Sequence, residues 1–481
     1  MTVHTIKEKM NMIVKRVSLT FAFLLGFLTT VVAQPGTVKK TADAAFTLTT
    51  FKADGSILAT SNGVCISTDG IAVSPWKPFV GADKAVIVDA KGQRHDVVCL
   101  LGADEIYNVA KFQVSGKTSA APLATTVSAS ESLWITPMTK SGNAVKADAS
   151  SIEKFMDRYN YTILTSAATD KLNGAPVVNA KGQVIGLFSI SGTSQSATDA
   201  NYPKDFVLKG LSQNDASLRQ SGLRIGLPHT LEEAVVALML SSEKPEIVHE
   251  AVIKDFIEKF PQVNDGYFAL ANMQIAKGEI SDADKALQTA IGKAKAKDEA
   301  HYNYARLVYQ NVLIPSLEEK VKAVGWSLDK ALGEIQQAQS IQQVDAYRHL
   351  QAQIIFAKGD YEKAYTEFEA LTRTKFNNPE LYLEMAQSRQ HLGATDKEIL
   401  DLLNKSIELC DTPYVSTSAP YFYTRGQQLE KMGEYRKAIQ DYYTYEYFNQ
   451  GRLGAGFYYM REQCEVKGRM WQQALQDILI A

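Results

Sequence analysis

The chain has 481 residues, with 51 Lys and Arg against 53 Asp and Glu, and a formal net charge of −2 at pH 7. This length suffices for two or three domains that each bury a core of their own. The near-neutral balance gives no strong field toward nucleic acid or anionic lipid, so the expected partners are proteins or peptides.

The N-terminus has the three parts of a secretory signal. A basic segment from Lys7 to Arg16 precedes an apolar stretch from Leu19 to Val32, and the small residue Ala33 follows at the expected cleavage site. The apolar stretch is short for a membrane span, which disfavours the alternative of an uncleaved anchor. We expect residues 1–33 to be a signal peptide and residues 34–44 a linker, with no stable membrane insertion after cleavage.

Three segments stand out between residues 45 and 211. The first, from Ser61 to Asp83, alternates apolar residues and carries turn glycines, which predicts a β-hairpin leading into an exposed loop. The second runs from Gly102 to Val114 and the third from Thr165 to Phe188. Together they resemble the active-site stretches of HtrA-type proteases, which are trypsin-like serine proteases. The resemblance implies a domain of two β-barrels over residues 45–211.

The resemblance places the catalytic triad on residues that cannot perform its chemistry. Lys77 takes the position of the histidine, Asn108 that of the aspartate and Asn173 that of the nucleophilic serine. A carboxamide cannot form an acyl-enzyme, and a lysine cation with an ordinary pKa of about 10.4 is not a base near neutral pH. Lys171 replaces a glycine of the oxyanion turn, which disfavours inward-pointing N–H groups. We therefore interpret this domain as catalytically inactive.

An alternative interpretation keeps hydrolase activity in this domain. Ser166, Ser189 and Ser191 are expected near the degenerate site, and one of them could act as a nucleophile with Lys77 as its base. Serines at strand ends usually form local hydrogen bonds, which favours the inactive interpretation. A fluorophosphonate probe distinguishes the two because it labels an activated serine.

The cysteines and histidines give no metal motif. Cys65 and Cys99 fall on predicted strands, whereas Cys410 and Cys464 fall on predicted helices. In an exported protein, disulfides within each half and four buried thiols are both compatible with this distribution. The chain has no CxxC or HExxH motif and its seven histidines do not cluster, so no metal site and no cofactor are expected.

A linker and a helical region follow the β domain. Residues 212–229 are polar and contain glycine, which predicts a linker. Thr230 and Glu233 have the spacing of a capping box that opens a helix through Leu240. From there to the end of the chain the hydrophobic period is near 3.6, and Leu231 to Phe260 is expected to form a capping helix pair.

The region 230–481 is repetitive. A Gly, an acidic residue, Tyr or Ile, two variable residues and Ala recur at Gly278, Gly359 and Gly433, with looser copies at Gly393 and Gly468. The step from Gly359 to Gly393 is 34 residues, which is the tetratricopeptide (TPR) period. The region therefore resembles TPR proteins, which implies an α-solenoid of five or six helix pairs. Val312 to Val324 and Asp411 to Ala419 do not fit a standard unit.

A solenoid of this kind presents the first helix of each pair along a concave groove. The residues six positions before each marker glycine are mostly amides: Asn272, Gln353, Gln387, Gln427 and Glu462. One helical turn earlier the chain has mostly aromatic or apolar residues: Phe268, His349, Leu383, Tyr423 and Tyr458. An amide offers a donor and an acceptor and could hold the backbone of a bound peptide. The alternative is that exposed helix positions are simply polar and favour Gln.

The expected fold class is multidomain, all-β plus all-α, with a trypsin-like double β-barrel followed by a TPR α-solenoid. The expected function is non-catalytic binding of proteins or peptides by a scaffold or adaptor. The signal segment and the HtrA resemblance imply export to the periplasm or cell surface of a Gram-negative bacterium.

Overall fold

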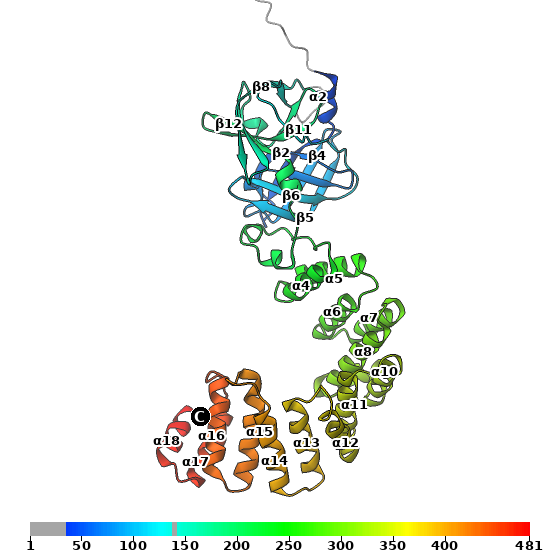
Figure 1. Cartoon of the computed structure of the whole chain (residues 1–481), viewed down its shortest axis with the longest axis vertical. Coiled ribbons are helices and arrows are strands. Elements are labelled where there is room, and N and C mark those ends of the chain that lie inside the picture. Colours follow the sequence, from blue (N-terminus) through cyan, green and yellow to red (C-terminus); the bar gives the residue numbers. More distant parts are fainter. Residues whose placement is uncertain (1–34, 137–141) are drawn as a thin grey trace, which may run out of the picture. The chain divides into compact units, whose positions relative to one another are not determined.

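The structure is a computed structural model that describes residues 35–136 and 142–481. The predicted signal peptide therefore lies outside the described residues. The chain divides into two compact units, Met1–Val252 and Ile253–Ala481. Figure 1 shows the β-strands gathered in the first unit and helices throughout the second.

The first unit contains two closed antiparallel barrels of six strands, and the strand order in the first is β1-β2-β3-β6-β5-β4. These strands are β1 (Ala45–Phe51), β2 (Ile57–Cys65), β3 (Ile71–Ser74), β4 (Lys84–Asp89), β5 (Arg94–Asp104) and β6 (Val109–Val114). Side chains at alternate positions fill the interior, where the rings of Phe46 and Phe112 meet edge to face with centroids 6.0 Å apart.

The second barrel repeats the topology of the first, with the order β7-β8-β9-β12-β11-β10. Its strands are β7 (Leu133–Ile135), β8 (Val145–Phe155), β9 (Tyr159–Ser166), β10 (Pro176–Asn179), β11 (Val184–Ser191) and β12 (Ser194–Asp199). Leu133, Ile135, Val177 and Phe188 pack in its core. The predicted double β-barrel is confirmed.

The residues just before β1 are not an open linker. They form a short helix, α2 (Gly36–Thr41). The hydroxyl groups of Thr37 and Thr41 donate 2.7 Å hydrogen bonds to the carbonyl oxygens of Ala180 and Gly182. Helix α2 therefore rests on the turn between β10 and β11.

Part of the segment expected as a second linker, residues 212–229, is instead built into the first barrel. Two short 3₁₀ helices, η3 (Gly210–Asn214) and η4 (Leu218–Gln220), lie along it, and Leu218, Leu223 and Ile225 enter the barrel core. The backbone of Leu100 exchanges 2.8 Å hydrogen bonds with Arg224 and Gly226. Because the segment is mostly polar, its composition did not indicate that these three separated apolar residues are buried. Their burial contributes favourably to the free energy of folding.

A helix pair then occupies the predicted place, with α4 (Leu231–Ser241) and α5 (Glu246–Lys259). The predicted capping box is wrong, because the Thr230 side chain makes no capping hydrogen bond with any described residue. Glu233 instead accepts a 2.5 Å hydrogen bond from the backbone N–H of Gly210 at the start of η3. A nearby helix end with unsatisfied N–H groups thus competes for the carboxylate.

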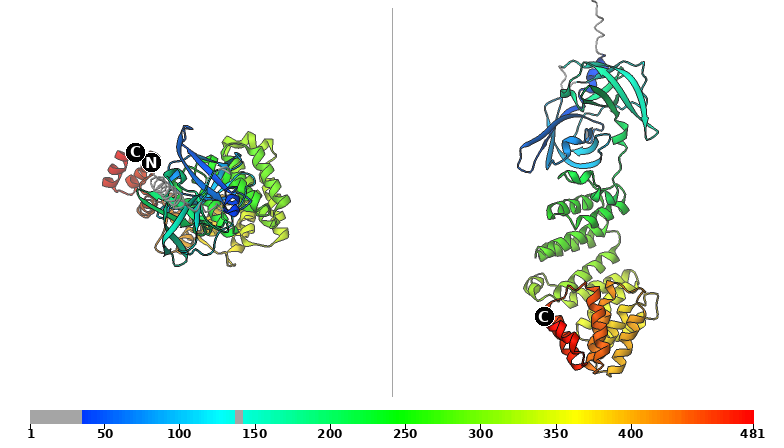
Figure 2. Two further views of the ribbon diagram at one scale, coloured as in Figure 1. Left: turned by 90° about the horizontal axis from the view of Figure 1, so that it is seen from above. Right: turned by 90° about the vertical axis from the view of Figure 1, so that its left-hand side faces the viewer.

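The second unit consists mainly of consecutive antiparallel helix pairs, and Figures 1 and 2 show those from α13 (yellow) to α18 (red) side by side. The pairs are α6 (Asn264–Ala276) with α7 (Ile280–Lys293), α8 (Lys297–Val312) with α10 (Leu328–Ile341), α11 (Asp345–Ala357) with α12 (Tyr361–Leu371), α13 (Pro379–His391) with α14 (Asp396–Glu408), α15 (Ala419–Lys431) with α16 (Tyr435–Phe448), and α17 (Ala455–Lys467) with α18 (Trp471–Ile480). The predicted α-solenoid is confirmed, with six pairs from Asn264 onward, a region that is described without gaps.

Glycine has a specific role at the turns of these pairs. Gly278, Gly359, Gly393 and Gly433 have φ between 74° and 88°, the left-handed conformation that ends a helix at little cost only for glycine. The last marker differs, since Gly468 has φ −76° and the next residue, Arg469, has φ 58°.

The segment that does not fit the repeat forms an extra element between α8 and α10. It contains the 3₁₀ turn η5 (Pro315–Leu317) and helix α9 (Glu318–Ala323). The buried indole of Trp326 follows and donates a 2.7 Å hydrogen bond to Asp284 on α7. The other irregular segment, residues 411–419, contains the 3₁₀ turn η6 (Ser416–Ser418).

All four cysteines are free thiols, three of them buried and Cys410 partly exposed. The structure therefore has thiols rather than disulfides. Within the described residues, no helix has the length and apolar character needed to cross a bilayer.

Candidate functional site

The structure brings the three residues expected at the triad positions to one region between the barrels. Lys77 begins the 3₁₀ helix η1 (Lys77–Phe79), and its backbone N–H donates a 2.8 Å hydrogen bond to the side-chain oxygen of Asn108. Asn108 has φ 51°, a left-handed conformation that Asn tolerates better than most residues. Its amide thus fixes the backbone at Lys77, and the Lys77 side chain is exposed.

Asn173 reaches this region from the second barrel, directly after the 3₁₀ helix η2 (Asp170–Leu172). Its carbonyl oxygen accepts hydrogen bonds from the backbone and side-chain N–H groups of Asn62 on β2, at 3.1 and 2.9 Å. A Cβ atom on the neighbouring Gly174 would lie 2.8 Å from Pro75, two residues before Lys77. The loop that would carry a nucleophile is therefore packed tightly against the first barrel.

The backbone N–H groups of Leu172 and Asn173 in this loop are used within the protein. The N–H of Asn173 donates a 2.9 Å hydrogen bond to the carbonyl oxygen of Asp170, and the N–H of Leu172 donates to Thr169 at 3.0 Å. The carbonyl of Lys171 accepts a 2.9 Å hydrogen bond from the Asn62 side chain. The N–H at the nucleophile position is therefore not available to an oxyanion.

The three serines of the alternative interpretation do not meet a base. Ser166 donates a 2.6 Å hydrogen bond to the side-chain oxygen of Gln195 and accepts one from the Ala168 N–H. Ser189 and Ser191 lie on β11. Among the residues with described positions, no hydrogen bond joins the Lys77 ammonium group to any of these serines.

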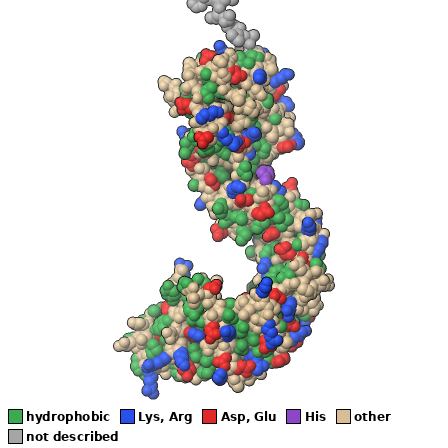
Figure 3. Space-filling view, viewed as in Figure 1, with side chains coloured by type: hydrophobic (Ala, Val, Ile, Leu, Met, Phe, Trp, Pro, Cys, Tyr) green, Lys and Arg blue, Asp and Glu red, His purple; other side chains and the backbone are tan. Residues whose placement is uncertain are grey.

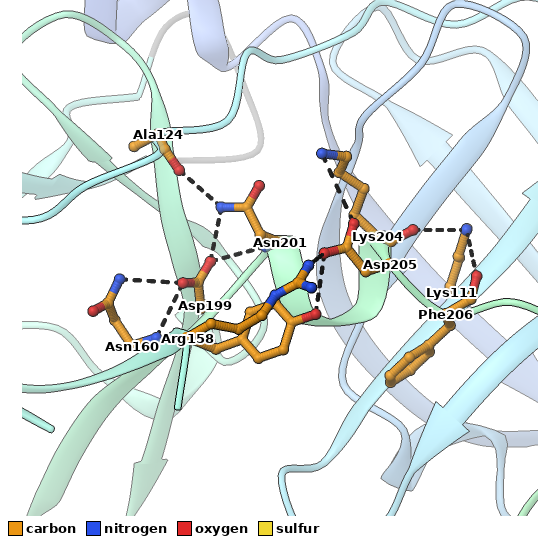
Figure 4. Close-up of polar contacts among 10 residues, drawn as sticks. Lys111, Ala124, Arg158, Asn160, Asp199, Asn201, Lys204, Asp205 and Phe206 are labelled. Atoms are coloured by element: carbon orange, nitrogen blue, oxygen red, sulfur yellow. Dashed lines mark hydrogen bonds and ion pairs between the residues drawn. The ribbon is translucent and has the colours of Figure 1, made fainter. Parts of the chain in front are cut away.

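Polar contacts around helix α3 (Asn201–Lys204) join the two barrels (Figure 4). At the second barrel, Asp199 accepts backbone hydrogen bonds from Asn160 at 3.0 Å and from Asn201 at 2.9 Å. The Asn201 amide donates to the carbonyl of Ala124 at 2.8 Å. At the first barrel, the Lys111 ammonium donates to the carbonyls of Lys204 and Phe206, at 2.7 and 2.8 Å (Figure 4).

A mostly apolar cavity of about 550 Å³ lies beside Lys111. Its walls include Ile66, Leu101, Phe206 and Leu208. Burial lowers the pKa of Lys111, and its bonds to two carbonyl oxygens account for its place in the wall. Lys204 also lines this cavity, and the Lys111 ammonium group is already bonded to two backbone carbonyls.

In the second unit, each residue expected to line the groove lies on the first helix of its pair. Asn272 is on α6, Gln353 on α11, Gln387 on α13, Gln427 on α15 and Glu462 on α17. Gln387 and Gln427 line one depression of about 220 Å³. These two amides are therefore neighbours on the surface.

The side chains one turn earlier differ in their exposure. Phe268, Leu383 and Tyr423 are partly buried, whereas His349 and Tyr458 are buried. The Tyr458 ring packs beside the Arg461 guanidinium, and its hydroxyl donates a 3.3 Å hydrogen bond to the Gly451 carbonyl. The aromatic track is thus interrupted at His349 and Tyr458.

The sequence analysis missed Arg306, which occupies the corresponding place on α8. Its guanidinium lies over the Phe268 ring, 4.6 Å from the centroid, and 5.5 Å from the centroid of Tyr302. Matching Ala305 to Ala352 would have located it, since each is the small buried residue just before the groove position. The other groove positions were counted back from the marker glycines. The irregular segment after α8 has no marker glycine at the corresponding place, so Arg306 was not counted.

Gln353 is hydrogen-bonded to a carboxylate, Glu384, that the sequence did not single out. Its amide donates a 2.7 Å hydrogen bond to one oxygen of Glu384, and His349 Nε2 lies 2.6 Å from the other. Burial is the strongest influence and lowers the pKa of His349, but the hydrogen bond to Glu384 and the negative charges of Glu384 and Glu380 together outweigh burial and raise this pKa. Burial raises the pKa of Glu384 in turn, against the effect of the His349 hydrogen bond. The predicted groove residues His349 and Gln353 are therefore both bonded to Glu384 on the next helix pair.

On the face shown in Figure 3, basic and acidic side chains are interspersed. No known family matches the chain, and no curated protein is significantly similar to it in sequence. The chain is therefore defined by its fold, a double β-barrel followed along the sequence by a helical solenoid.

Proposed function

We propose that the protein is a non-catalytic scaffold or adaptor that binds proteins or peptides after export to the periplasm or cell surface of a Gram-negative bacterium. In this proposal the first unit is an HtrA-like, trypsin-like domain that has lost its catalytic triad. The second unit is a TPR solenoid whose concave face is the main binding surface.

The observation that carries the proposal is the row of polar side chains on the first helices of successive pairs. Gln387 and Gln427 share a depression, and Arg306 lies over the ring of Phe268. Amides can donate to and accept from a peptide backbone, and a guanidinium backed by an aromatic ring can bind a carbonyl or carboxylate. Such a surface supports recognition of a polypeptide with modest dependence on its side chains.

Two features support the absence of catalysis. Lys77, Asn108 and Asn173 supply neither a nucleophile nor a neutral base nor a carboxylate. The N–H of Asn173 is also bonded to Asp170, so a stabilising donor for a tetrahedral intermediate is missing at that position. Labelling of the wild-type protein by a fluorophosphonate would overturn this part of the proposal.

The binding surface is tested with Gln387→Ala/Gln427→Ala, compared with Gln336→Ala/Gln440→Ala. Gln336 and Gln440 are exposed on α10 and α16, the second helices of their pairs. Partners captured from the producing cells are identified with the wild type, and their affinities for both variants are then measured. Loss of two hydrogen bonds should weaken binding by the first variant at least ~5-fold and leave the second unchanged. Equal affinities would contradict the proposed surface.

A further inference from the structure

A histidine and two glutamates converge where α11 meets α13. His349 is on α11, and Glu380 and Glu384 lie one turn apart on α13. One donor atom from each side chain lies within 4.8 Å of the other two. The His349 and Glu384 side chains are only 10% and 12% exposed, whereas Glu380 is open to solvent.

A second pair in the same unit shows what is unusual about this cluster. His301 Nδ1 lies 2.6 Å from Glu334, which is also the separation of His349 Nε2 and Glu384. One turn before Glu334 the chain has Lys330, whose ammonium pairs with it at 2.8 Å. One turn before Glu384 it has a carboxylate instead, Glu380.

The two clusters therefore differ in charge. Lys330 adds a positive charge to the His301–Glu334 pair, whereas Glu380 adds a negative charge to the His349–Glu384 pair. Glu380 forms no ion pair with any Lys or Arg among residues 35–136 and 142–481. Two carboxylates so close together repel each other, and a cation bound between them relieves this repulsion.

We propose that His349, Glu380 and Glu384 form a binding site for a divalent metal ion of the zinc type. The ligands are Nε2 of His349 and one carboxylate oxygen from each glutamate. An imidazole nitrogen favours Zn²⁺ and related transition metals over Mg²⁺ and Ca²⁺, which prefer six or more oxygen ligands. Three protein ligands leave a coordination position open to water or to a group on a bound molecule.

The surroundings of the cluster support this assignment. The Gln353 amide donates a 2.7 Å hydrogen bond to the second oxygen of Glu384, the kind of outer contact that orients a metal-binding carboxylate. Zinc ligands at roughly 2 Å from the metal lie about 3.3 Å from each other in a tetrahedral site. The 2.6 Å contact between His349 and Glu384 must therefore open by less than about 1 Å, which small side-chain rotations provide.

The test is calorimetric titration of Zn²⁺ into the full-length mature chain, purified without a polyhistidine tag and treated with a chelator. We expect one equivalent of Zn²⁺ to bind, and Mg²⁺ to bind far more weakly. Glu380→Gln should weaken Zn²⁺ binding at least ~10-fold, because it removes one ligand from an exposed position with little effect on folding. The matched control is Glu362→Gln, an exposed glutamate on α12, which should leave Zn²⁺ affinity unchanged.

A gain of binding is the complementary test. Lys330→Glu gives the His301–Glu334 pair a second carboxylate at the same helical spacing, so this variant should bind a second equivalent of Zn²⁺. No Zn²⁺ binding by the wild type, or equal affinity in Glu380→Gln, would overturn the proposed site. A single equivalent in folded Lys330→Glu would contradict the premise that a second carboxylate completes such a site. Because neither the titration nor its variants uses a peptide, failure here leaves the proposed function standing.

Discussion

The backbone N–H of Asn173 donates a 2.9 Å hydrogen bond to the carbonyl oxygen of Asp170. In an active trypsin-like cleft the N–H of the nucleophilic residue instead helps to bind the oxyanion of the intermediate. If the loop is compared with such a cleft, as the proposed function does, it differs in its backbone as well as its side chains, so we expect side-chain substitutions alone to leave it inactive.

We predict that the triple variant Lys77→His/Asn108→Asp/Asn173→Ser folds but does not hydrolyse peptides. The substitutions supply the three side chains of a triad. The backbone N–H of residue 173 still donates its hydrogen bond to the Asp170 carbonyl, so it cannot bind an oxyanion. Fluorophosphonate labelling and turnover of a fluorogenic peptide library check this, with circular dichroism as the control for folding. Turnover by the triple variant at a protease-like rate would show that the loop opens more readily than its hydrogen bonds indicate.

Substitution of two helical glycines by alanine should change the free energy of unfolding in opposite directions. A Cβ atom on Gly426 of α15 would lie 2.8 Å from the Tyr442 ring on α16, whereas one on Gly333 of α10 meets no atom within 4 Å. Gly426→Ala should therefore lower the free energy of unfolding by about 1–3 kcal/mol. Gly333→Ala should raise it by about 0.4–1 kcal/mol, because it restricts the unfolded chain. Denaturant unfolding measures both, and equal effects would contradict the close approach of α15 and α16.

A buried ion cluster should dominate the stability of the last helix pair. The Arg461 side chain is 2% exposed and bonds both oxygens of Asp477 at 2.6 and 2.8 Å, with Glu446 at 2.6 Å. Arg461→Ala leaves the buried Asp477 without its partner and should lower the free energy of unfolding by about 3–5 kcal/mol. Arg373→Ala breaks an exposed pair with Glu369 and should cost at most about 1 kcal/mol. Similar costs for the two variants, measured by denaturant unfolding, would be inconsistent with the burial of Arg461.

The thiols should differ sharply in reactivity. Burial raises the pKa of Cys65 and of Cys464 to about 12, so few thiolates exist at either site near neutral pH. Cys410 is the one partly exposed thiol. We expect a thiol reagent to modify Cys410 first in the native protein and all four cysteines after denaturation. Fewer than four reactive thiols in the denatured, unreduced protein would reveal a disulfide.

Periodicity predicted the helix pairs because it is a local property of the chain, and the spacing of the marker glycines matches one repeat. Alternating residues predicted a β-hairpin between Ser61 and Asp83, whereas the two barrels were implied by the resemblance to HtrA-type proteases. Residues 212–229 escaped this reasoning, because Leu218, Leu223 and Ile225 contact a barrel formed more than a hundred residues earlier. Composition cannot reveal such a contact.

The helix that carries each predicted groove residue was predictable from the sequence, but the contacts of these residues were not. Counting back from the glycines placed Gln353 on the correct helix, yet the Glu384 that binds its amide belongs to the next pair. His349 and Glu384 are 35 positions apart, so no short motif signals their contact. Arg306 was missed for a different reason, since the extra helix α9 interrupts the repeat just after it.

The most direct test of the account is site-specific photo-crosslinking in the cells that produce the protein. A benzophenone amino acid replaces Gln387 or Gln427 on the first helices, and Gln336 or Gln440 on the second helices in the control proteins. The account predicts covalent adducts with another polypeptide from the first two positions and none from the controls. Adducts of equal yield from all four positions, or from the controls alone, would contradict binding by the concave face.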